Sequence, residues 1–252
     1  MFIPLHDRND LDHIDRQYVT LIIIGVNVLA WLATALSGSS GALTEAAVLG
    51  LGFIPAVAYG GAELAPEFVL VPEPVTYLSY AFLHANFMHL ATNMLFLWVF
   101  GDNVEDALGH FRFLVFYLAC AAAGAVLHGL LDPGSQAPLI GASGAVAGVV
   151  AAYLVLHPRV RVWVLALGRI PLPLPAWIPL ALWVIYQFVM IVIDQGGSIS
   201  WAAHVGGIIA GAILVVLMKR REVPLFDRQI VSPRSVVHKG ASVPRVPRRW
   251  GR

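Results

Sequence analysis

The segment that decides the fold reads GASGAVAGVVAAYLVL and covers residues 141–156. It is almost wholly apolar, and its length approaches the roughly 20 residues that a helix needs to cross a hydrocarbon core about 30 Å thick. Pro138 and Gly141 favour a non-helical approach to it. The segment therefore predicts a buried helix with Ser143 at its start, where unpaired backbone N–H groups suit a developing oxyanion.

The rest of the chain shares this apolar character, since 58% of its 252 residues are hydrophobic and only 12% are charged. A soluble domain does not hide so much apolar surface. We identify six membrane spans, at residues 18–36, 75–100, 111–131, 141–156, 177–193 and 201–218. The expected fold is an all-α, polytopic bundle of six transmembrane helices. Its predicted parts are an N-terminal segment (1–17), a membrane domain (18–218) and a basic, disordered tail (219–252).

The positive charges predict the orientation of the bundle, because Lys and Arg collect on the cytoplasmic side of membrane proteins. All 16 Lys and Arg residues fall before the first span, in the second-to-third and fourth-to-fifth connections, or after the sixth span. We therefore predict an integral protein of the bacterial inner membrane with both termini cytoplasmic. The basic tail is expected to be attracted to anionic lipid. No phosphate loop, aromatic stacking motif or zinc-ligand spacing supports nucleic-acid binding.

Polar residues inside the spans are the candidate functional groups, because burying them in hydrocarbon is costly unless they face protein or water. The main ones are Ser143, His204 and, in the second span, His84, His89 and Asn93. Counting back from the cytoplasmic ends at about 1.5 Å per helical residue places Ser143, His204 and His89 about 24, 22 and 20 Å from those ends. The three therefore share one layer below the outer surface.

The spacing of residues within the spans indicates that these polar groups lie near one another. His89 and Asn93 are four residues apart and so lie on one face of a helix. Small residues recur in the fourth and sixth spans, and they allow close helix packing that would bring Ser143 to His204; they are Gly144, Gly148, Gly207 and Gly211. Taken singly, the serine and the glycines are more typical of helix packing, and both His84 and His128 more typical of structural hydrogen bonding.

In combination, these residues resemble the signature of the rhomboid family of intramembrane serine proteases. The matching elements are Gly141-Ala142-Ser143-Gly144, His204 followed by Gly207 and Gly211, the His89 and Asn93 pair, and Gly101-Asp102-Asn103-Val104-Glu105. The resemblance extends from the first span through the sixth. It implies a serine endopeptidase that needs no metal or organic cofactor and cleaves single-span, membrane-anchored proteins near the extracytoplasmic leaflet.

The resemblance also implies a role for each residue. Ser143 would be the nucleophile and His204 its general base and acid. The oxyanion would be stabilised by His89, Asn93 and the backbone N–H of Ser143. Supporting residues would be His84, Gly141, Gly144, Gly207 and Gly211. No carboxylate of the sixth span is placed to orient His204, so no third catalytic residue is predicted.

Two features depart from the pattern of the family. Many rhomboids have a Trp-Arg pair in the first loop, whereas residues 37–73 contain neither Trp nor Arg. Some relatives have an aromatic residue four positions after the serine that packs on the histidine, and here that position is Ala147. The conformation of the first loop and the orientation of His204 are therefore left open.

Three other functions are compatible with an apolar, histidine-containing chain. A non-proteolytic rhomboid-like protein would bind membrane clients, but the retention of Ser143 and His204 argues against it. A haem or metal protein would use the membrane histidines, but their spacing matches no metal motif. A transporter would show inverted repeats or charges near the midplane, and neither is visible. The protease remains the favoured interpretation.

Overall fold

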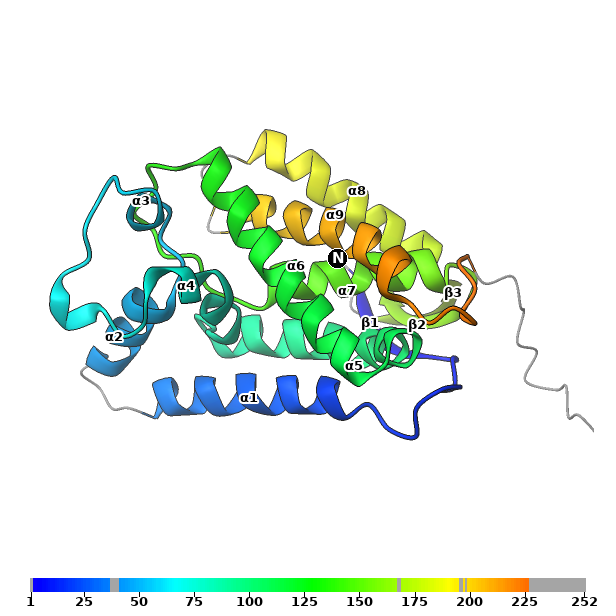
Figure 1. Ribbon diagram of the computed structural model, residues 1–252. Helices are drawn as coiled ribbons and strands as arrows, with labels where there is room; N and C mark the ends of the chain where they lie inside the picture. The colour runs from blue at the N-terminus through cyan, green and yellow to red at the C-terminus, as the bar shows by residue number, and fades with distance from the viewer. Residues whose placement is uncertain (1, 37–40, 167–168, 195–196, 198, 227–252) are drawn as a thin grey trace, which may run out of the picture.

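The structure is a computed structural model that describes residues 2–36, 41–166, 169–194, 197 and 199–226. Long helices form a bundle, which Figure 1 shows with α7 in its interior. They are α1 (Tyr18–Ala35), α5 (Phe87–Leu108), α6 (His110–Leu131), α7 (Ser143–Leu156), α8 (Trp177–Ile193) and α9 (Trp201–Met218). Nearly every residue of α7 is buried, which suits its small and apolar side chains. The predicted helical membrane bundle is confirmed.

Helix length and composition bear on the number of membrane crossings. Among the described residues, α1, α6 and α9 are each long and apolar enough to cross a membrane. The helices α7 and α8 are apolar but shorter. The 22 residues of α5 end with three acidic side chains, those of Asp102, Glu105 and Asp106. The count of six spans therefore stays a prediction.

The second predicted span is interrupted in the structure. The helix α4 (Glu73–Ser79) and the 3-10 helix η2 (Tyr80–Phe82) end before a short non-helical stretch, after which α5 begins. Asn86 caps α5, because its side-chain oxygen accepts a hydrogen bond from the His89 N–H at 2.9 Å. An apolar run alone does not reveal this cap. The depth of about 20 Å predicted for His89 takes Asp102 as the cytoplasmic end of its helix. That distance is too short, since α5 continues to Leu108.

The first loop contains helices and supports the segment before Ser143. The short helices α2 (Ala42–Leu51), α3 (Pro55–Ala58) and η1 (Pro66–Phe68) gather with α4 at one end of the bundle (Figure 1). The backbones of Phe53 and Leu139 exchange hydrogen bonds of 3.1 and 2.8 Å. The Ala56 N–H donates to the Ser135 carbonyl at 2.9 Å. The loop thus fixes the chain that leads into α7.

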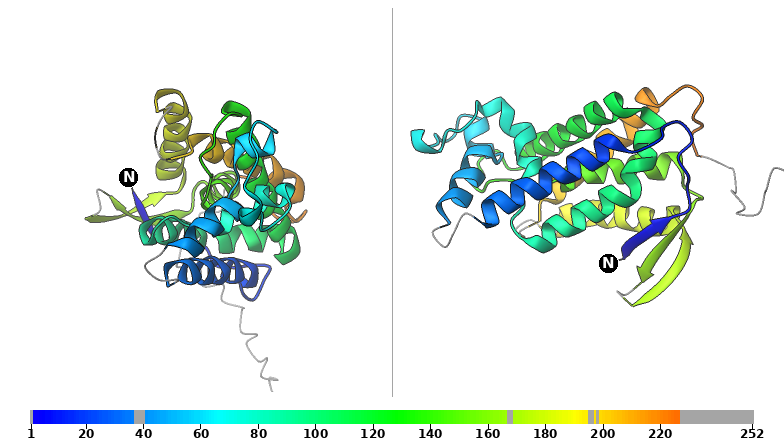
Figure 2. Two further views of the ribbon diagram at one scale, coloured as in Figure 1. Left: turned by 90° about the vertical axis from the view of Figure 1, so that its left-hand side faces the viewer. Right: turned by 90° about the horizontal axis from the view of Figure 1, so that it is seen from below.

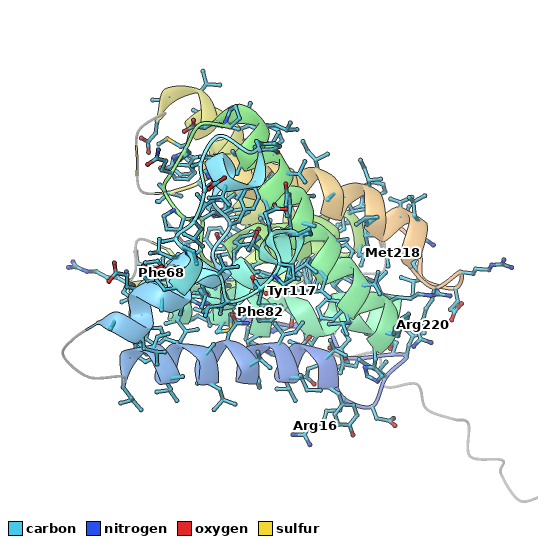
Figure 3. All side chains as sticks on the ribbon, turned by 60° about the vertical axis from the view of Figure 1, so that its left-hand side comes forward. Arg16, Phe68, Phe82, Tyr117, Met218 and Arg220 are labelled. Atoms are coloured by element: carbon cyan, nitrogen blue, oxygen red, sulfur yellow. The ribbon has the colours of Figure 1, made fainter. Side chains whose placement is uncertain are left out.

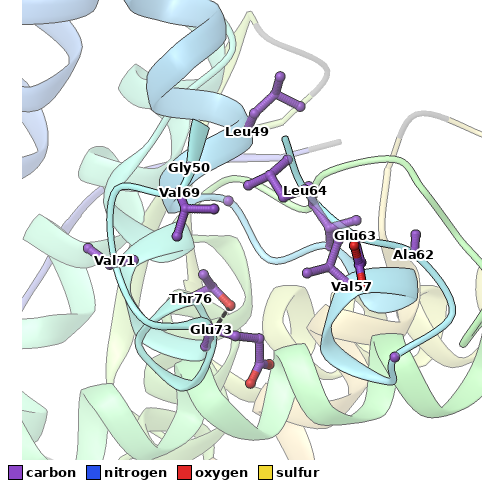
Figure 4. A pocket seen from close by; sticks show the side chains of 13 residues that line it. Leu49, Gly50, Val57, Ala62, Glu63, Leu64, Val69, Val71, Glu73 and Thr76 are labelled. Carbon is purple, nitrogen blue, oxygen red and sulfur yellow. Dashed lines mark hydrogen bonds between the residues drawn. The ribbon is translucent and has the colours of Figure 1, made fainter. Parts of the chain in front are cut away.

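A hollow of about 450 Å³ opens within this loop region (Figure 4). Leu49, Val69, Glu73 and Thr76 are among its lining residues. None of the residues that line it is a predicted site residue. The hollow is therefore separate from the layer of polar groups inside the spans.

A small antiparallel sheet lies at the opposite end of the bundle (Figure 2). Its three strands are β1 (Ile3–Asp7), β2 (Arg161–Ala166) and β3 (Ile170–Pro175), in the order β1-β2-β3. The all-α expectation holds for the bundle but did not anticipate this sheet. The edge strand β3 contains Pro171, Pro173 and Pro175. Prolines are tolerated there because an edge strand has only one neighbour to bond.

The carboxyl group of Asp7 anchors β1 to the bundle. Asp7 is 4% exposed, and it accepts hydrogen bonds from the Tyr153 hydroxyl at 2.7 Å and the Asn103 amide at 3.0 Å. Burial raises the pKa of Asp7 from 3.8 to about 7; the Tyr153 hydrogen bond opposes this rise and the charge of Asp102 adds to it. Docking of β1 is therefore linked to pH.

Stability is expected to fall as pH rises from 3.8 to about 7, the pKa of folded Asp7, and to level off above it. Between pH 3.8 and about 7 the folded protein keeps a proton on Asp7 that the unfolded chain has lost. The free energy of unfolding therefore decreases by about 1.4 kcal/mol per pH unit in this range. Asp7→Asn should flatten this dependence, as measured by thermal unfolding in detergent from about pH 4.5 to about pH 8.5. Asp10→Asn, at an exposed position, is the control. An unchanged profile in Asp7→Asn would contradict the assignment.

The end of α5 also caps the start of α1. The Glu105 side chain is fully buried and accepts hydrogen bonds from the N–H groups of Val19 and Thr20 at 2.9 and 2.8 Å and from the Thr20 hydroxyl at 2.7 Å. The Nδ1 atom of His110 lies 2.5 Å from Oε1 of Glu105, the oxygen that also accepts from the Val19 N–H. Glu105 therefore satisfies donors at the start of α1 that have no partner within that helix.

Glu105→Ala is expected to destabilise the protein by about 2 to 4 kcal/mol, because it leaves several buried donors without an acceptor. The measurement is thermal or denaturant unfolding in detergent micelles. Glu222→Ala is the matched control, since Glu222 is exposed and its loss should change stability by less than about 0.5 kcal/mol. Equal stability of the two variants would show that Glu105 is not a cap.

The first residues of the predicted tail pack against the bundle. The Arg220 N–H donates to the Ala107 carbonyl and the Phe226 N–H to the Val155 carbonyl, both at 2.9 Å, and Val223 is buried. Figure 3 shows Arg220 toward the same end as Arg16 and away from Phe68 of the first loop. Residues 227–252 lie outside the described part of the chain, so the predicted tail and the division into three parts stay predictions.

Candidate active site

The helices α7 and α9 approach each other closely at the level of the candidate residues. A Cβ atom built on Gly207 would lie 1.9 Å from the Gly144 carbonyl oxygen, and one built on Gly211 would lie 2.2 Å from that of Gly148. Any side chain at either position would force the helices apart. The predicted small-residue contact between the fourth and sixth spans is therefore confirmed.

This contact places the neighbourhoods of Ser143 and His204 against each other. A Cβ atom on Gly144 would lie 3.1 Å from the carbonyl oxygen of Ala203, the residue before His204. Ser143 and His204 are both partly exposed, although the residues that follow Ser143 along α7 are buried. Both side chains therefore belong to adjoining helices and remain accessible to a reacting group.

The backbone before Ser143 has the non-helical form that the sequence predicts. Gly141 has a φ of +125°, which L side chains rarely adopt, and its N–H donates to the Tyr80 carbonyl at 3.0 Å. The helix α7 then begins at Ser143. The N–H groups of its first turn have no acceptor within the helix and are available to an anion.

The His89 ring lies against Gly141, two residues before α7 begins. A Cβ atom on Gly141 would be 2.6 Å from Cε1 and 2.7 Å from Nε2 of His89. Glycine is thus required at position 141 for two reasons, its backbone conformation and the space that the His89 ring occupies. The structure therefore brings a polar group of α5 to the start of α7.

His84 orients Asn93, the other polar residue of this group. The Asn93 amide nitrogen lies 3.2 Å from His84 Nε2, and the rings of His84 and His89 meet edge to face with centroids 5.1 Å apart. An amide has two N–H donors, so one remains for another acceptor. Among the described residues, His84 Nδ1 has no hydrogen-bond partner. His84 therefore fixes one N–H of the Asn93 amide.

The surroundings of His204 include residues that were not predicted. Its Nδ1 lies 2.8 Å from the side-chain oxygen of Gln187 on α8. Trp183 packs beside its ring with centroids 6.3 Å apart and an interplanar angle of 31°, and Trp201 meets it edge to face at 5.9 Å. These indoles give His204 aromatic neighbours that Ala147 on α7 does not provide. The sequence signal that could have identified Gln187 is its position as a polar amide within the apolar run 177–193.

The remaining membrane histidine has a structural partner. His128 Nδ1 lies 2.9 Å from the Ser200 hydroxyl, and Ser200 also caps α9 by accepting from the Ala203 N–H at 3.1 Å. Within the part of the chain that the structure describes, no group of three or more His, Cys, Asp or Glu residues is placed to hold a metal ion. The histidines therefore do not form a shared metal centre among those residues.

Comparison with known proteins identifies the domain. Residues 72–221 match the family model described as Rhomboid domain. Similar proteins include Rhomboid protein 1, mitochondrial, of Saccharomyces cerevisiae, which is 32% identical over 148 residues that make up 57% of this chain and 41% of the yeast protein. RHOMBOID-like protein 12, mitochondrial, of Arabidopsis thaliana is 30% identical over 155 residues, 55% of this chain and 44% of the plant protein.

A bacterial protein is also similar. Rhomboid protease GluP of Bacillus subtilis is 29% identical over 157 residues, which are 60% of this chain and 27% of the bacterial protein. The chain thus matches less than half the length of each of these three relatives. The matches concern the shared domain and not the whole activity, substrates or partners of those proteins.

Proposed function

This chain belongs to the rhomboid family, and on that premise we propose that it is an intramembrane serine endopeptidase with Ser143 as its nucleophile and His204 as its base. Members of the family are generally intramembrane serine proteases that act on transmembrane substrates. The observation that carries the proposal is the contact between α7 and α9. It sets the start of α7 at Ser143 against the turn of α9 that contains His204.

The proposed reaction has two stages. Ser143 Oγ attacks the carbonyl carbon of the scissile peptide while His204 Nε2 accepts the hydroxyl proton. His204 then delivers that proton to the leaving amine, the C–N bond breaks, and an acyl-enzyme remains. In the second stage a water molecule, deprotonated by His204, attacks the ester carbonyl, and the proton returns to Ser143 Oγ as the carboxylic product leaves.

The negative charge of each tetrahedral intermediate requires donors at the start of α7. The Ser143 N–H is one, since it lies in the first turn of a helix. His89 and Asn93 supply the others under this proposal. The position of the His89 ring over Gly141 and the fixing of the Asn93 amide by His84 support their assignment. A preorganised donor of this kind commonly lowers the barrier by about 3 to 4 kcal/mol.

The proposed substrates are single-span membrane proteins, which are cleaved near the extracytoplasmic leaflet. Six crossings by α1, α5, α6, α7, α8 and α9 would place the sheet and both termini in the cytoplasm, where Arg16 and Arg220 belong by the charge rule. The protein is an integral membrane protein. Its location in a bacterial inner membrane, and contact of the tail with anionic lipid, are parts of the proposal.

The proposal is tested by cleavage of a tagged single-span substrate in liposomes. The wild type is expected to release a fragment that Ser143→Ala does not produce, while Ser79→Ala, which removes a hydroxyl bonded to the Leu51 carbonyl, should cleave like the wild type. A wild type that binds the substrate without cleaving it would favour a client-binding protein. Equal cleavage by the wild type and Ser143→Ala would show that the nucleophile is wrong.

A further inference from the structure

Gln187 lies in the middle of α8 with its amide turned into the protein. It is 2% exposed, whereas Leu182 and Ile185 on the same helix are 64% and 58% exposed. The neighbouring exposed side chains are apolar and suit contact with lipid. A buried amide in such a helix is costly unless both its oxygen and its nitrogen find partners. The partners of Gln187 therefore show what the side chain does.

Those partners fix which way the amide points. The Gln187 nitrogen donates to the Trp183 carbonyl one turn earlier, at 3.1 Å, and the oxygen lies 2.8 Å from His204 Nδ1. A carbonyl only accepts hydrogen bonds, so the amide nitrogen must face Trp183 and the oxygen must face His204. The reversed amide would place two oxygens against each other. This arrangement determines the amide orientation from the network itself.

The amide orientation in turn determines the tautomer of His204. An oxygen acceptor at 2.8 Å from Nδ1 requires that Nδ1 carry the proton. The neutral ring then has its lone pair on Nε2, the atom that must take the proton of Ser143. The opposite tautomer would place two acceptors together at Nδ1 and leave Nε2 without a lone pair.

We propose that Gln187 is the positioning residue of the catalytic base: its side-chain oxygen fixes the His204 ring and holds it in the Nδ1-protonated tautomer, which leaves Nε2 free to accept the proton of Ser143. This inference rests on the proposed protease function. A neutral amide sets the tautomer as a carboxylate does in soluble serine proteases, but without placing a charge inside the membrane. Trp183 also packs on His204, so α8 supplies both a hydrogen bond and a ring contact to a residue of α9.

The test compares Gln187→Met, which keeps the length of the side chain but removes the acceptor, with Gln187→Glu, which keeps an oxygen at the same place. Leu182→Met introduces the same residue at a lipid-facing position of α8 and is the control. Gln187→Met is expected to lower kcat for the tagged single-span substrate about 10- to 100-fold, with KM within about 2-fold. Gln187→Glu should retain more activity than Gln187→Met, and Leu182→Met should match the wild type.

A packing role predicts the opposite order, because methionine suits an apolar interior better than a carboxyl group does. Equal or greater activity of Gln187→Met relative to Gln187→Glu would therefore overturn the inference. A second measurement does not depend on turnover: the ¹⁵N shifts of labelled His204 should report a protonated Nδ1 in the wild type and a mixture of tautomers in Gln187→Met. An unchanged tautomer in that variant would also overturn it.

The same assay separates this inference from the proposed function. Ser143→Ala is included in every experiment. If it cleaves like the wild type, the protease proposal itself fails. If it is inactive while Gln187→Met is fully active, the protease stands and only the role of Gln187 is rejected.

Discussion

A fluorophosphonate is expected to label this protein covalently at Ser143, and Ser143→Ala is expected to abolish the label. Only a serine with a base beside it should attack so weak an electrophile efficiently. Ser143 lies at the start of α7, next to Gly144, whose surroundings include the carbonyl of Ala203 on α9. Some other serines have hydroxyls that are held in structural hydrogen bonds. The hydroxyl of Ser79, for instance, donates to the Leu51 carbonyl at 2.6 Å.

The labelled site is identified by gel fluorescence followed by peptide mapping. Ser79→Ala serves as the matched control and should be labelled like the wild type. A label that survives in a folded Ser143→Ala variant would mean that another nucleophile reacts with the probe. A wild type that is not labelled at all, under conditions in which it cleaves a substrate, would mean that a mechanism without an activated serine operates.

Helix positions were predictable wherever an apolar run ends at polar or breaking residues. The fifth and sixth predicted spans, 177–193 and 201–218, match α8 and α9 at both ends. The second span was not predicted correctly, because the helical path stops at Phe82 and α5 begins only after the N-cap Asn86, and hydropathy does not register capping. Composition therefore locates membrane segments better than it locates breaks inside them.

The sheet could not be predicted because its pairing is not local. In the register of β1 with β2, Ile3 faces Leu165 and Asp7 faces Val162. Each strand is short, and β3 contains alternating prolines that argue against a strand when the partner is unknown. The strands β1 and β2 are far apart in the sequence, and they become neighbours only when the helices between them have packed into the bundle.

The sequence proposes the residues of the candidate site, but it does not show the contacts that those residues make between helices. Spacing along one helix indicated that His89 and Asn93 share a face, and the structure adds that His84 is the hydrogen-bond partner of Asn93. Contacts between helices depend on how each helix is rotated about its axis, which the sequence does not specify. For this reason the hydrogen bond from His204 to Gln187 was missed, although the polar residue itself was visible.

The proposed roles at the site predict a graded loss of fluorophosphonate labelling. His204→Ala removes the proton acceptor and is expected to slow labelling about 10²- to 10⁴-fold. Asn93→Ala removes one oxyanion donor but leaves His89 and the Ser143 N–H in place, so part of the reactivity should remain, with a loss smaller than that of His204→Ala. Thr92→Ala is the control, because its hydroxyl bonds to the carbonyls of Met88 and His89 within its own helix.

The order of the rates distinguishes chemistry from damage to the fold. Thermal unfolding in detergent selects the variants that are correctly folded, and labelling rates are then compared only among those. His204 accepts the proton during the attack of Ser143, whereas the Asn93 amide stabilises the negative charge that the attack creates. The labelling rate of His204→Ala should therefore be lower than that of Asn93→Ala. Labelling of a folded His204→Ala variant at the rate of the wild type would reject the proposed dyad, even with Ser143 as the modified residue.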